Sequence, residues 1–354
     1  MKEKQHITDS LFISMEEMIG EPLSHEEATA QLMKDPNVYN SFLSCPKEIQ
    51  DELLSFIMGE SGLYITYDAF FKRIMSPNLH PRRLESFLSA VLNTSVTIID
   101  VVPNEGFIIR ERNSLVIMDI IVKTIDGAII NVEMQKIGHS FPGQRTECYV
   151  ADSIMRQYNT ARDELGKSFS YNKIRPAYLI VLMEDSPNEF IKAAPNYMHI
   201  RKVVYDTGIS LPTLENICII SLDTFNKVMQ NKTITNELEA WLTFFSCTDM
   251  KRINQLISDF PEFVEIYKEI WRLRLDMEEL INMFSRSLAE ADYYNELSMI
   301  REFKAEAKAL AAEIEEKKAE IADKDAEIAD KDAEIADKDA EIAMLLAEIE
   351  KLRA

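Results

Sequence analysis

Residues 117–135 of this 354-residue chain read IMDIIVKTIDGAIINVEMQ, two apolar runs that meet at Asp126-Gly127. An Asp-Gly pair between apolar runs predicts a β-hairpin turn. Because side chains alternate between the two faces of a strand, each run divides into an apolar set and a mostly polar set. The apolar sets are Met118, Ile120, Val122 and Ile130, Val132, Met134; the other sets include Asp119, Lys123 and Asn131, Glu133, Gln135.

The register of this hairpin follows from burial, since the two apolar sets must lie on the same face. A two-residue loop that pairs Ile125 with Ala128 would split both sets and put Asp119 opposite Met134. A three-residue loop with Gly127 in the left-handed conformation pairs Thr124 with Ala128 instead. That register sets Asp119 directly opposite Glu133, so we expect both carboxylates on one face of the sheet.

Two carboxylates on neighbouring strands have Cβ atoms about 5 Å apart, close enough to bind one hard cation. We expect Mg²⁺ or Mn²⁺ as the bound cation. Such an ion polarises a phosphate oxygen and lowers the pKa of a bound water. Gln135 faces the same site and can orient that water or the phosphate, but it cannot supply the positive charge of a lysine.

Asp119 followed by Glu133-Met134-Gln135 on the next strand is similar to the D...E-x-K core of the PD-(D/E)XK nucleases, with glutamine in place of lysine. More closely, residues 67–75, 131–135 and 145–149 resemble the recombination-promoting nuclease and transposase family, whose members commonly show E-x-Q. The similarity runs from about Tyr64 to Phe284. The repeat tail and the first sixty residues fall outside it.

The resemblance implies an α/β fold with a restriction-endonuclease-like core, in which helices flank a four-stranded mixed sheet. It also implies Mg²⁺- or Mn²⁺-dependent DNA cleavage by an endonuclease of the transposase and recombination type. Asp119 and Glu133 then become metal ligands, and Gln135 becomes a catalytic residue. The family pattern extends to Asp68 as a further acid, and to Lys72, Arg145 and Tyr149 as DNA contacts.

Each of these residues also has an ordinary structural interpretation. Asp119 and Glu133 can be polar residues on a solvated strand face, and Asp68 can cap a helix with its side chain. Lys72 and Arg145 can be ordinary surface charges. Tyr149, one helical turn after Arg145, can be a packing residue. The missing lysine favours a second hypothesis, a catalytically inactive DNA-binding or regulatory protein that retains the nuclease fold.

The periodicity of the chain predicts three parts: helices over residues 1–62, the nuclease-like domain over 63–285, and a long helix over 286–354. Within the first two parts we expect helices at 47–58, 67–75, 81–92, 143–164 and in the stretch 237–284, with a capping box at Ser24 and Glu27. The expected strands are 98–102, 107–110, 115–124, 128–135, 177–183, 199–205 and 216–222.

The tail contains the sequence Ala-Glu-Ile-Ala-Asp-Lys-Asp three times between Ala319 and Asp339, a period of seven. With isoleucine at position a, position d holds Lys324, Lys331 and Lys338, and an apolar pair occurs only in the last two heptads. The pattern is typical of either a solvated single helix or a coiled coil. The latter would make the protein a homo-oligomer or an interaction protein.

The net charge of −21 argues against a polyanionic partner, because phosphate neutralisation requires lysine and arginine. Residues 301–354 hold 10 basic and 17 acidic residues, a net −7, which leaves −14 for the preceding 300. DNA contact is therefore expected through local basic patches and bound cations. The chain shows neither a secretory signal nor an apolar run long enough to cross a membrane, so we expect a cytoplasmic protein.

Overall fold

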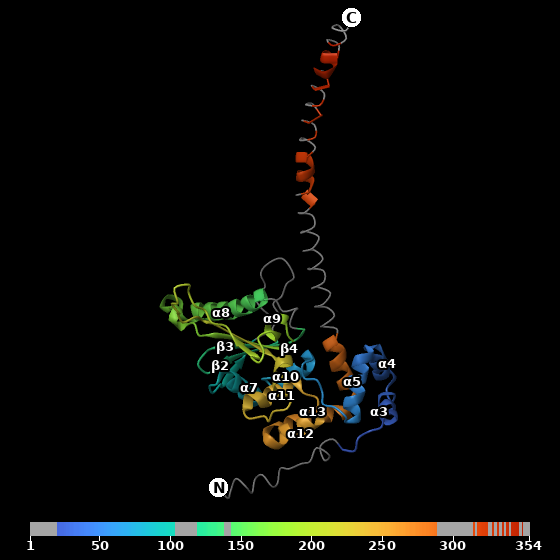
Figure 1. The fold of residues 1–354 in the computed structure, drawn as a ribbon. Coiled ribbons are helices and arrows are strands. Elements are labelled where there is room, and N and C mark those ends of the chain that lie inside the picture. The colour runs from blue at the N-terminus through green and yellow to red at the C-terminus, as the bar shows by residue number, and fades with distance from the viewer. Residues whose placement is uncertain are drawn as a thin grey trace. The chain divides into compact units, whose positions relative to one another are not determined.

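The computed structural model describes residues 20–102, 119–137 and 143–288, and part of the tail between Ile314 and Ile349. The chain divides into two compact units, Met1–Glu290 and Ala291–Ala354. The predicted strand at 107–110 and the start of the predicted strand at 115–124 lie outside the described residues. The first unit is a mixed sheet with helices on both faces (Figure 1).

The sheet has six strands in the order β1-β2-β3-β4-β6-β5. Strands β3, β4 and β6 run parallel, while β1–β2, β2–β3 and β5–β6 are antiparallel pairs. Two edge strands thus extend a central set of four. The bounds are β1 (Ile98–Val101), β2 (Ile120–Thr124), β3 (Ile129–Ile137), β4 (Ala177–Asp185), β5 (Met198–Ile200) and β6 (Glu215–Ser221).

The helices begin and end close to the positions that capping and periodicity predict. Ser24 and Glu27 form the predicted capping box, and one helix ends at Gly59, which has φ +86°. The bounds are α3 (His25–Leu32), α4 (Pro36–Ser44), α5 (Lys47–Met58), α6 (Asp68–Ile74), α7 (Pro81–Leu92), α8 (Gly143–Leu165), α9 (Asn188–Ile191), α10 (Leu222–Met229), α11 (Glu237–Ser246), α12 (Met250–Asp259) and α13 (Val264–Arg272). Residues 277–288 are also helical.

The β2–β3 hairpin has the predicted register. Ile120 pairs with Val132 and Val122 pairs with Ile130. Gly127 has φ +86°, and its backbone N–H donates to the carbonyl of Thr124 at 2.9 Å, which closes the three-residue loop. The Thr124 N–H donates to the carbonyl of Ala128 at 3.0 Å. The requirement that both apolar sets be buried on one face therefore sufficed to fix the pairing.

The two faces of the sheet contribute to two separate apolar clusters. Ile120, Val122, Ile130 and Val132 belong to the larger cluster, to which α6, α7, α10 and α11 contribute. The opposite face packs against α8 through a smaller cluster that includes Ile121, Ile129, Tyr149, Val150 and Val181. Figure 1 shows α8 on one side of the sheet and α7, α10 and α11 on the other.

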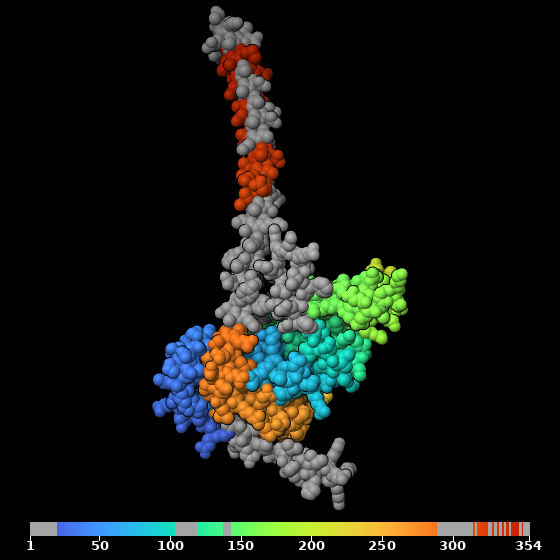
Figure 2. Space-filling model, turned by 180° about the vertical axis from the view of Figure 1, so that it is seen from behind, coloured from blue at the N-terminus to red at the C-terminus, as the bar shows by residue number. Residues whose placement is uncertain are grey.

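The N-terminal helices are part of the larger core. Leu53, Phe56 and Ile57 of α5 are each at most 1% exposed. The ring of Phe56 stacks on that of Trp271 with centroids 5.1 Å apart, and Arg274 donates from Nε to the Ile57 carbonyl at 2.9 Å. Figure 2 shows these helices (blue) directly beside the segment that contains α13 (orange). Helices α3–α5 and the nuclease-like segment therefore share one hydrophobic core.

Strand β5 is shorter than the predicted strand at 199–205. After Ile200 the chain leaves the sheet and forms a tight turn, in which the Tyr205 N–H donates to the Ile209 carbonyl at 2.9 Å. Val203, Val204 and Tyr205 are all more than 40% exposed. Their apolar character predicted a strand, but β5 lies at the sheet edge, and no strand of the described residues pairs with residues 203–205.

The described residues of the tail, between Ile314 and Ile349, are helical. The isoleucines at position a are exposed, with Ile321 at 58% and Ile342 at 53%. A continuous long helix and its assembly into a coiled coil stay predictions. Across the described parts of the chain, no helix combines the length and the apolar character needed to span a membrane.

Candidate metal centre

Asp119 and Glu133 meet at the end of the β2–β3 hairpin. The register of the hairpin, extended by one residue beyond Ile120, places Asp119 opposite Glu133. The Asp119 N–H donates to Glu133 Oε1 at 3.2 Å, and the Met134 N–H donates to Asp119 Oδ2 at 2.8 Å. Each carboxylate is thus held by the backbone of the other strand. Both side chains lie on the face of the sheet that α8 covers.

The pair is buried, and burial dominates its electrostatics. Glu133 is 0% exposed and the side chain of Asp119 is 12% exposed. Burial raises the pKa of Asp119 to about 6, although the nearby Lys72 charge acts in the opposite direction. Burial, and then the charge of Asp119, raise the pKa of Glu133 well above its usual value. The cations of the described residues offset the negative charge of this pair only in part, so both pKa values stay raised.

Lys72 and Asp68 come from α6 and reach the same place. Lys72 Nζ lies 3.3 Å from Asp119 Oδ1 and 2.8 Å from Asp68 Oδ1. Asp68 makes no side-chain cap for α6, whose N-cap is Tyr67, so the cap interpretation of Asp68 is wrong. The negative charge of Asp68 also raises the pKa of Asp119. Helix α6 therefore brings one cation and one further acid to the carboxylate pair.

Gln135 faces the pair, and the lysine that follows it does not. The Gln135 Nε2 lies 3.5 Å from Glu133 Oε2, at the limit of a hydrogen bond. Lys136 points to the other face of β3, where its Nζ lies 3.5 Å from the centroid of the Tyr67 ring and 3.9 Å from Glu184 Oε2. Lys136 therefore cannot replace the lysine of the E-x-K pattern, whereas Lys72 already lies beside Asp119.

Arg145 and Tyr149 approach the pair from α8. Arg145 Nε donates to the Tyr149 hydroxyl oxygen at 2.6 Å, and the charge of Arg145 lowers the pKa of Glu133. Tyr149 is only 2% exposed, and burial raises the pKa of its hydroxyl. This placement suits Tyr149 to the wall of the site, where it orients Arg145. DNA contact by Lys72, Arg145 and Tyr149 stays a prediction.

Asn131 belongs to the site as well, although the sequence pattern alone assigns it no role. It is 1% exposed, and its Nδ2 donates to Glu133 Oε1 at 2.9 Å, while its own buried Oδ1 has no hydrogen-bond partner among the described residues. Strand alternation already placed Asn131 on the face of Glu133. The sequence could not show that the Asn131 amide donates a hydrogen bond to the carboxylate of Glu133, two residues along the same strand.

The residues present fit a divalent cation. The donors are carboxylate oxygens, which Mg²⁺ and Mn²⁺ prefer, and Mg²⁺ is commonly bound through one or two carboxylates plus waters and substrate phosphate. Within the described ranges no group of three or more His, Cys, Asp or Glu side chains gathers as a ready-made ligand set. A bound cation would neutralise the negative charge of Asp119 and Glu133 that Lys72 and Arg145 offset only in part.

The raised pKa values predict a pH-dependent stability of the metal-free protein. A carboxyl whose pKa is higher in the folded chain contributes stability that is full below its unfolded pKa and is lost as pH rises through the folded value, about 6 for Asp119. The double variant Asp119→Asn, Glu133→Gln should therefore be more stable than the wild type at pH 8 in EDTA. The expected gain is about 2 kcal/mol, or roughly 5 °C in Tm.

Thermal unfolding in EDTA between pH 5 and pH 8 measures this effect. The gain should shrink toward pH 5, where the wild-type carboxyls are protonated. Addition of Mg²⁺ at pH 8 should raise the Tm of the wild type and leave that of the double variant unchanged. A gain that is the same at every pH would mean that the pair is not the cause.

One of the comparisons with known proteins identifies a family. Residues 65–300 match the family described as PD-(D/E)XK nuclease family transposase. The matched range covers the greater part of the chain and includes every residue of the site described above. No curated protein and no solved structure matches the chain.

Proposed function

The chain belongs to the PD-(D/E)XK nuclease family transposases, and from this premise we propose that it is a metal-dependent DNA endonuclease that hydrolyses phosphodiester bonds. The observation that carries the proposal is the pair Asp119 and Glu133, which are opposed on adjacent strands, buried and held by each other's backbone. Conversion of supercoiled plasmid to nicked or linear DNA in Mg²⁺ or Mn²⁺, but not in EDTA, tests it.

In this proposal each residue has a distinct task. Asp119 and Glu133 hold Mg²⁺ or Mn²⁺, which when bound polarises a phosphate oxygen and activates a water. Asn131 fixes Glu133 through the hydrogen bond at 2.9 Å. Gln135 orients the water or the phosphate through its amide. Arg145, positioned by Tyr149, faces the phosphate backbone of DNA.

We assign to Lys72 the positive charge that Gln135 cannot supply. Its Nζ lies 3.3 Å from Asp119 Oδ1, and in this proposal the ammonium offsets the negative charge that builds on the phosphate during hydrolysis. Asp68 holds the ammonium from the other side at 2.8 Å. In the metal-free protein the same ammonium neutralises part of the Asp119 charge, so it competes with a cation for that carboxylate.

The variant Lys72→Met separates these two effects. Loss of the ammonium should lower the cleavage rate about 10- to 100-fold, because a charge-assisted contact to the phosphate is lost. The affinity for Mn²⁺, measured by calorimetry without DNA, should rise. Lys47→Met is the matched control, since Lys47 makes the same i,i+4 ion pair with Asp51 at 2.7 Å on the exposed surface of α5. If Lys72 had only a structural role, its replacement would lower the cleavage rate and the Tm together, without a gain in Mn²⁺ affinity.

A second candidate function is DNA binding without cleavage, which the glutamine at position 135 favours. The same plasmid assay distinguishes it, because a binding protein would retard DNA without cutting it in any metal. Assembly of the chain into a homo-oligomer through the heptad tail is a separate proposal, supported by the exposed isoleucines at position a.

A further inference from the structure

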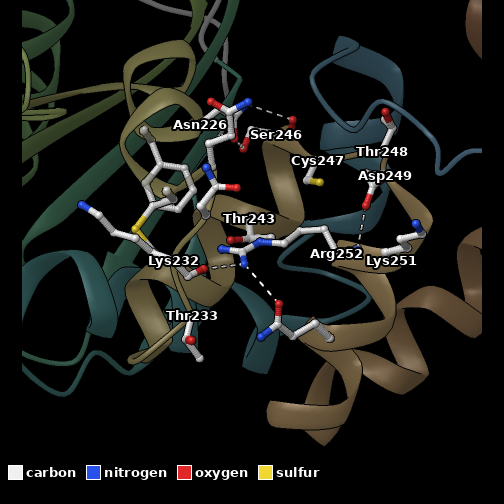
Figure 3. Close-up of a pocket in the computed structure, with 15 residues that line it drawn as sticks. Asn226, Lys232, Thr233, Thr243, Ser246, Cys247, Thr248, Asp249, Lys251 and Arg252 are labelled. Atoms are coloured by element: carbon white, nitrogen blue, oxygen red, sulfur yellow. Dashed lines mark hydrogen bonds between the residues drawn. The ribbon is translucent and has the colours of Figure 1, made fainter.

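A polar hollow lies between α10, α11 and the N-terminal end of α12, formed by residues outside the carboxylate site (Figure 3). Its volume is about 840 Å³. The buried side chains of Phe225 and Met229 form its apolar lining, and hydroxyl, amide and cationic groups make up most of the remainder. None of its lining residues has a task in the proposed nuclease chemistry.

The charge of the hollow is opposite to that of the protein. Lys232, Lys251 and Arg252 line it, against the single carboxylate of Asp249. Asp249 is the N-cap of α12, and its Oδ1 accepts from the Arg252 N–H at 2.8 Å. Three cations and one carboxylate, which already accepts the N-cap hydrogen bond, give the hollow a net positive charge in a chain of net charge −21. The positive end of the α12 dipole adds to this charge.

Two buried polar groups on the wall lack partners within the described part of the chain. Arg252 donates from Nη1 to the Lys232 carbonyl at 2.6 Å and lies 3.2 Å from Gln255 Oε1, but its Nη2 is buried without a hydrogen-bond partner. Thr243 is 2% exposed, and its Oγ1 also has no partner. Figure 3 shows both side chains on the wall of the hollow.

These orphaned groups point to a missing ligand. A buried donor without a partner is unfavourable, and because Arg252 Nη2 belongs to a cation, an anionic acceptor satisfies it best. The described residues provide no carboxylate within ion-pair distance of Arg252. An acceptor with several oxygens and more than one negative charge would satisfy the guanidinium, the hydroxyl and the two lysines together, which matches a phosphate group better than a carboxylate.

We propose that this hollow binds a phosphate group, through Arg252 Nη2 and the Thr243 hydroxyl at its wall and the ammonium groups of Lys232 and Lys251 at its rim. The volume of the hollow leaves room for the organic part of a phosphate ester beside Phe225 and Met229. The phosphate comes either from a free ester such as a nucleotide or from the backbone of a nucleic acid. This site is independent of the carboxylate pair, so its test does not depend on cleavage.

Calorimetric titration of the full chain with inorganic phosphate, in EDTA at pH 7.5, tests the proposal. Thr243→Val removes the hydroxyl with little change of volume, and Lys251→Gln removes an exposed charge, so both leave the bond between Arg252 and the Lys232 carbonyl in place. Each variant should weaken phosphate binding about tenfold. Lys227→Gln is the matched control, because Lys227 is exposed on α10 and does not line the hollow.

The expected result is equal phosphate binding by the wild type and Lys227→Gln, and binding about tenfold weaker in the other two variants, with the Tm of all four proteins in EDTA within a few degrees. Absence of phosphate binding by the wild type, or equal binding by all four proteins, would overturn the proposal. Competition then identifies the source of the phosphate. A nucleoside monophosphate that binds more tightly than inorganic phosphate indicates a free ester, whereas displacement of phosphate by a short DNA duplex indicates the nucleic-acid backbone.

Discussion

The double variant Asp119→Asn, Glu133→Gln should cleave plasmid DNA in Mg²⁺ at least about 10³-fold more slowly than the wild type. Both substitutions keep the shape of the side chains and remove the charges that hold the cation. The hydrogen bond from the Met134 N–H to Asp119, at 2.8 Å, can be kept by the asparagine oxygen. The loss should therefore reflect chemistry and metal binding, and the fold should be retained.

Asp163→Asn serves as the control for this variant. Asp163 is an exposed acid on α8, so its replacement changes the net charge in the same direction without touching the site. It should cleave at the wild-type rate. Cleavage by the double variant within a few-fold of wild type, in a protein whose Tm in EDTA is no lower than that of the wild type, would show that other groups perform the hydrolysis.

The sequence predicted that Asp119 lies opposite Glu133 because two constraints agreed. The apolar faces of the hairpin allowed one register, and Gly127 allowed the three-residue loop that this register needs. The helices at 47–58 and 81–92 have the predicted bounds for a similar reason. Pro81 begins α7 at its first turn, and Gly59 and Asn93 end α5 and α7 in the left-handed conformation.

The sequence pattern could not predict contacts between residues that lie far apart in the chain. Lys72 stood out in the family motif, but neither periodicity nor spacing shows that its ammonium meets Asp119, which lies on a strand far along the chain. The same holds for Arg252 and Thr243, which come from two helices and look like ordinary surface and core residues in the sequence. Such contacts depend on how elements pack against one another, which a single sequence constrains only weakly.

Phe56→Ala should lower the free energy of unfolding of the unit Met1–Glu290 by about 3–5 kcal/mol. Phe56 is 1% exposed, and its ring stacks on Trp271 with an interplanar angle of 18°. The substitution removes that contact and leaves a cavity between α5 and α13. Urea unfolding of the full chain, followed by tryptophan fluorescence, measures the loss.

Met33→Ala is the control for the core substitution. Met33 follows α3 and is 57% exposed, so its truncation should cost less than about 0.5 kcal/mol. A cost for Phe56→Ala as small as that of the control would mean that the N-terminal helices are an accessory element, as the predicted boundary after residue 62 implies. The expected large cost would make residues 25–58 an integral part of the nuclease-like fold.

The proposed hydrolysis depends on a cation that Asp119 and Glu133 bind together. The most direct measurement is anomalous X-ray scattering from crystals of the protein soaked in Mn²⁺, with the double variant Asp119→Asn, Glu133→Gln treated in the same way. We expect an anomalous peak between the two carboxylates in the wild type and no peak there in the variant. A wild-type peak at another place, with none between Asp119 and Glu133, would contradict it.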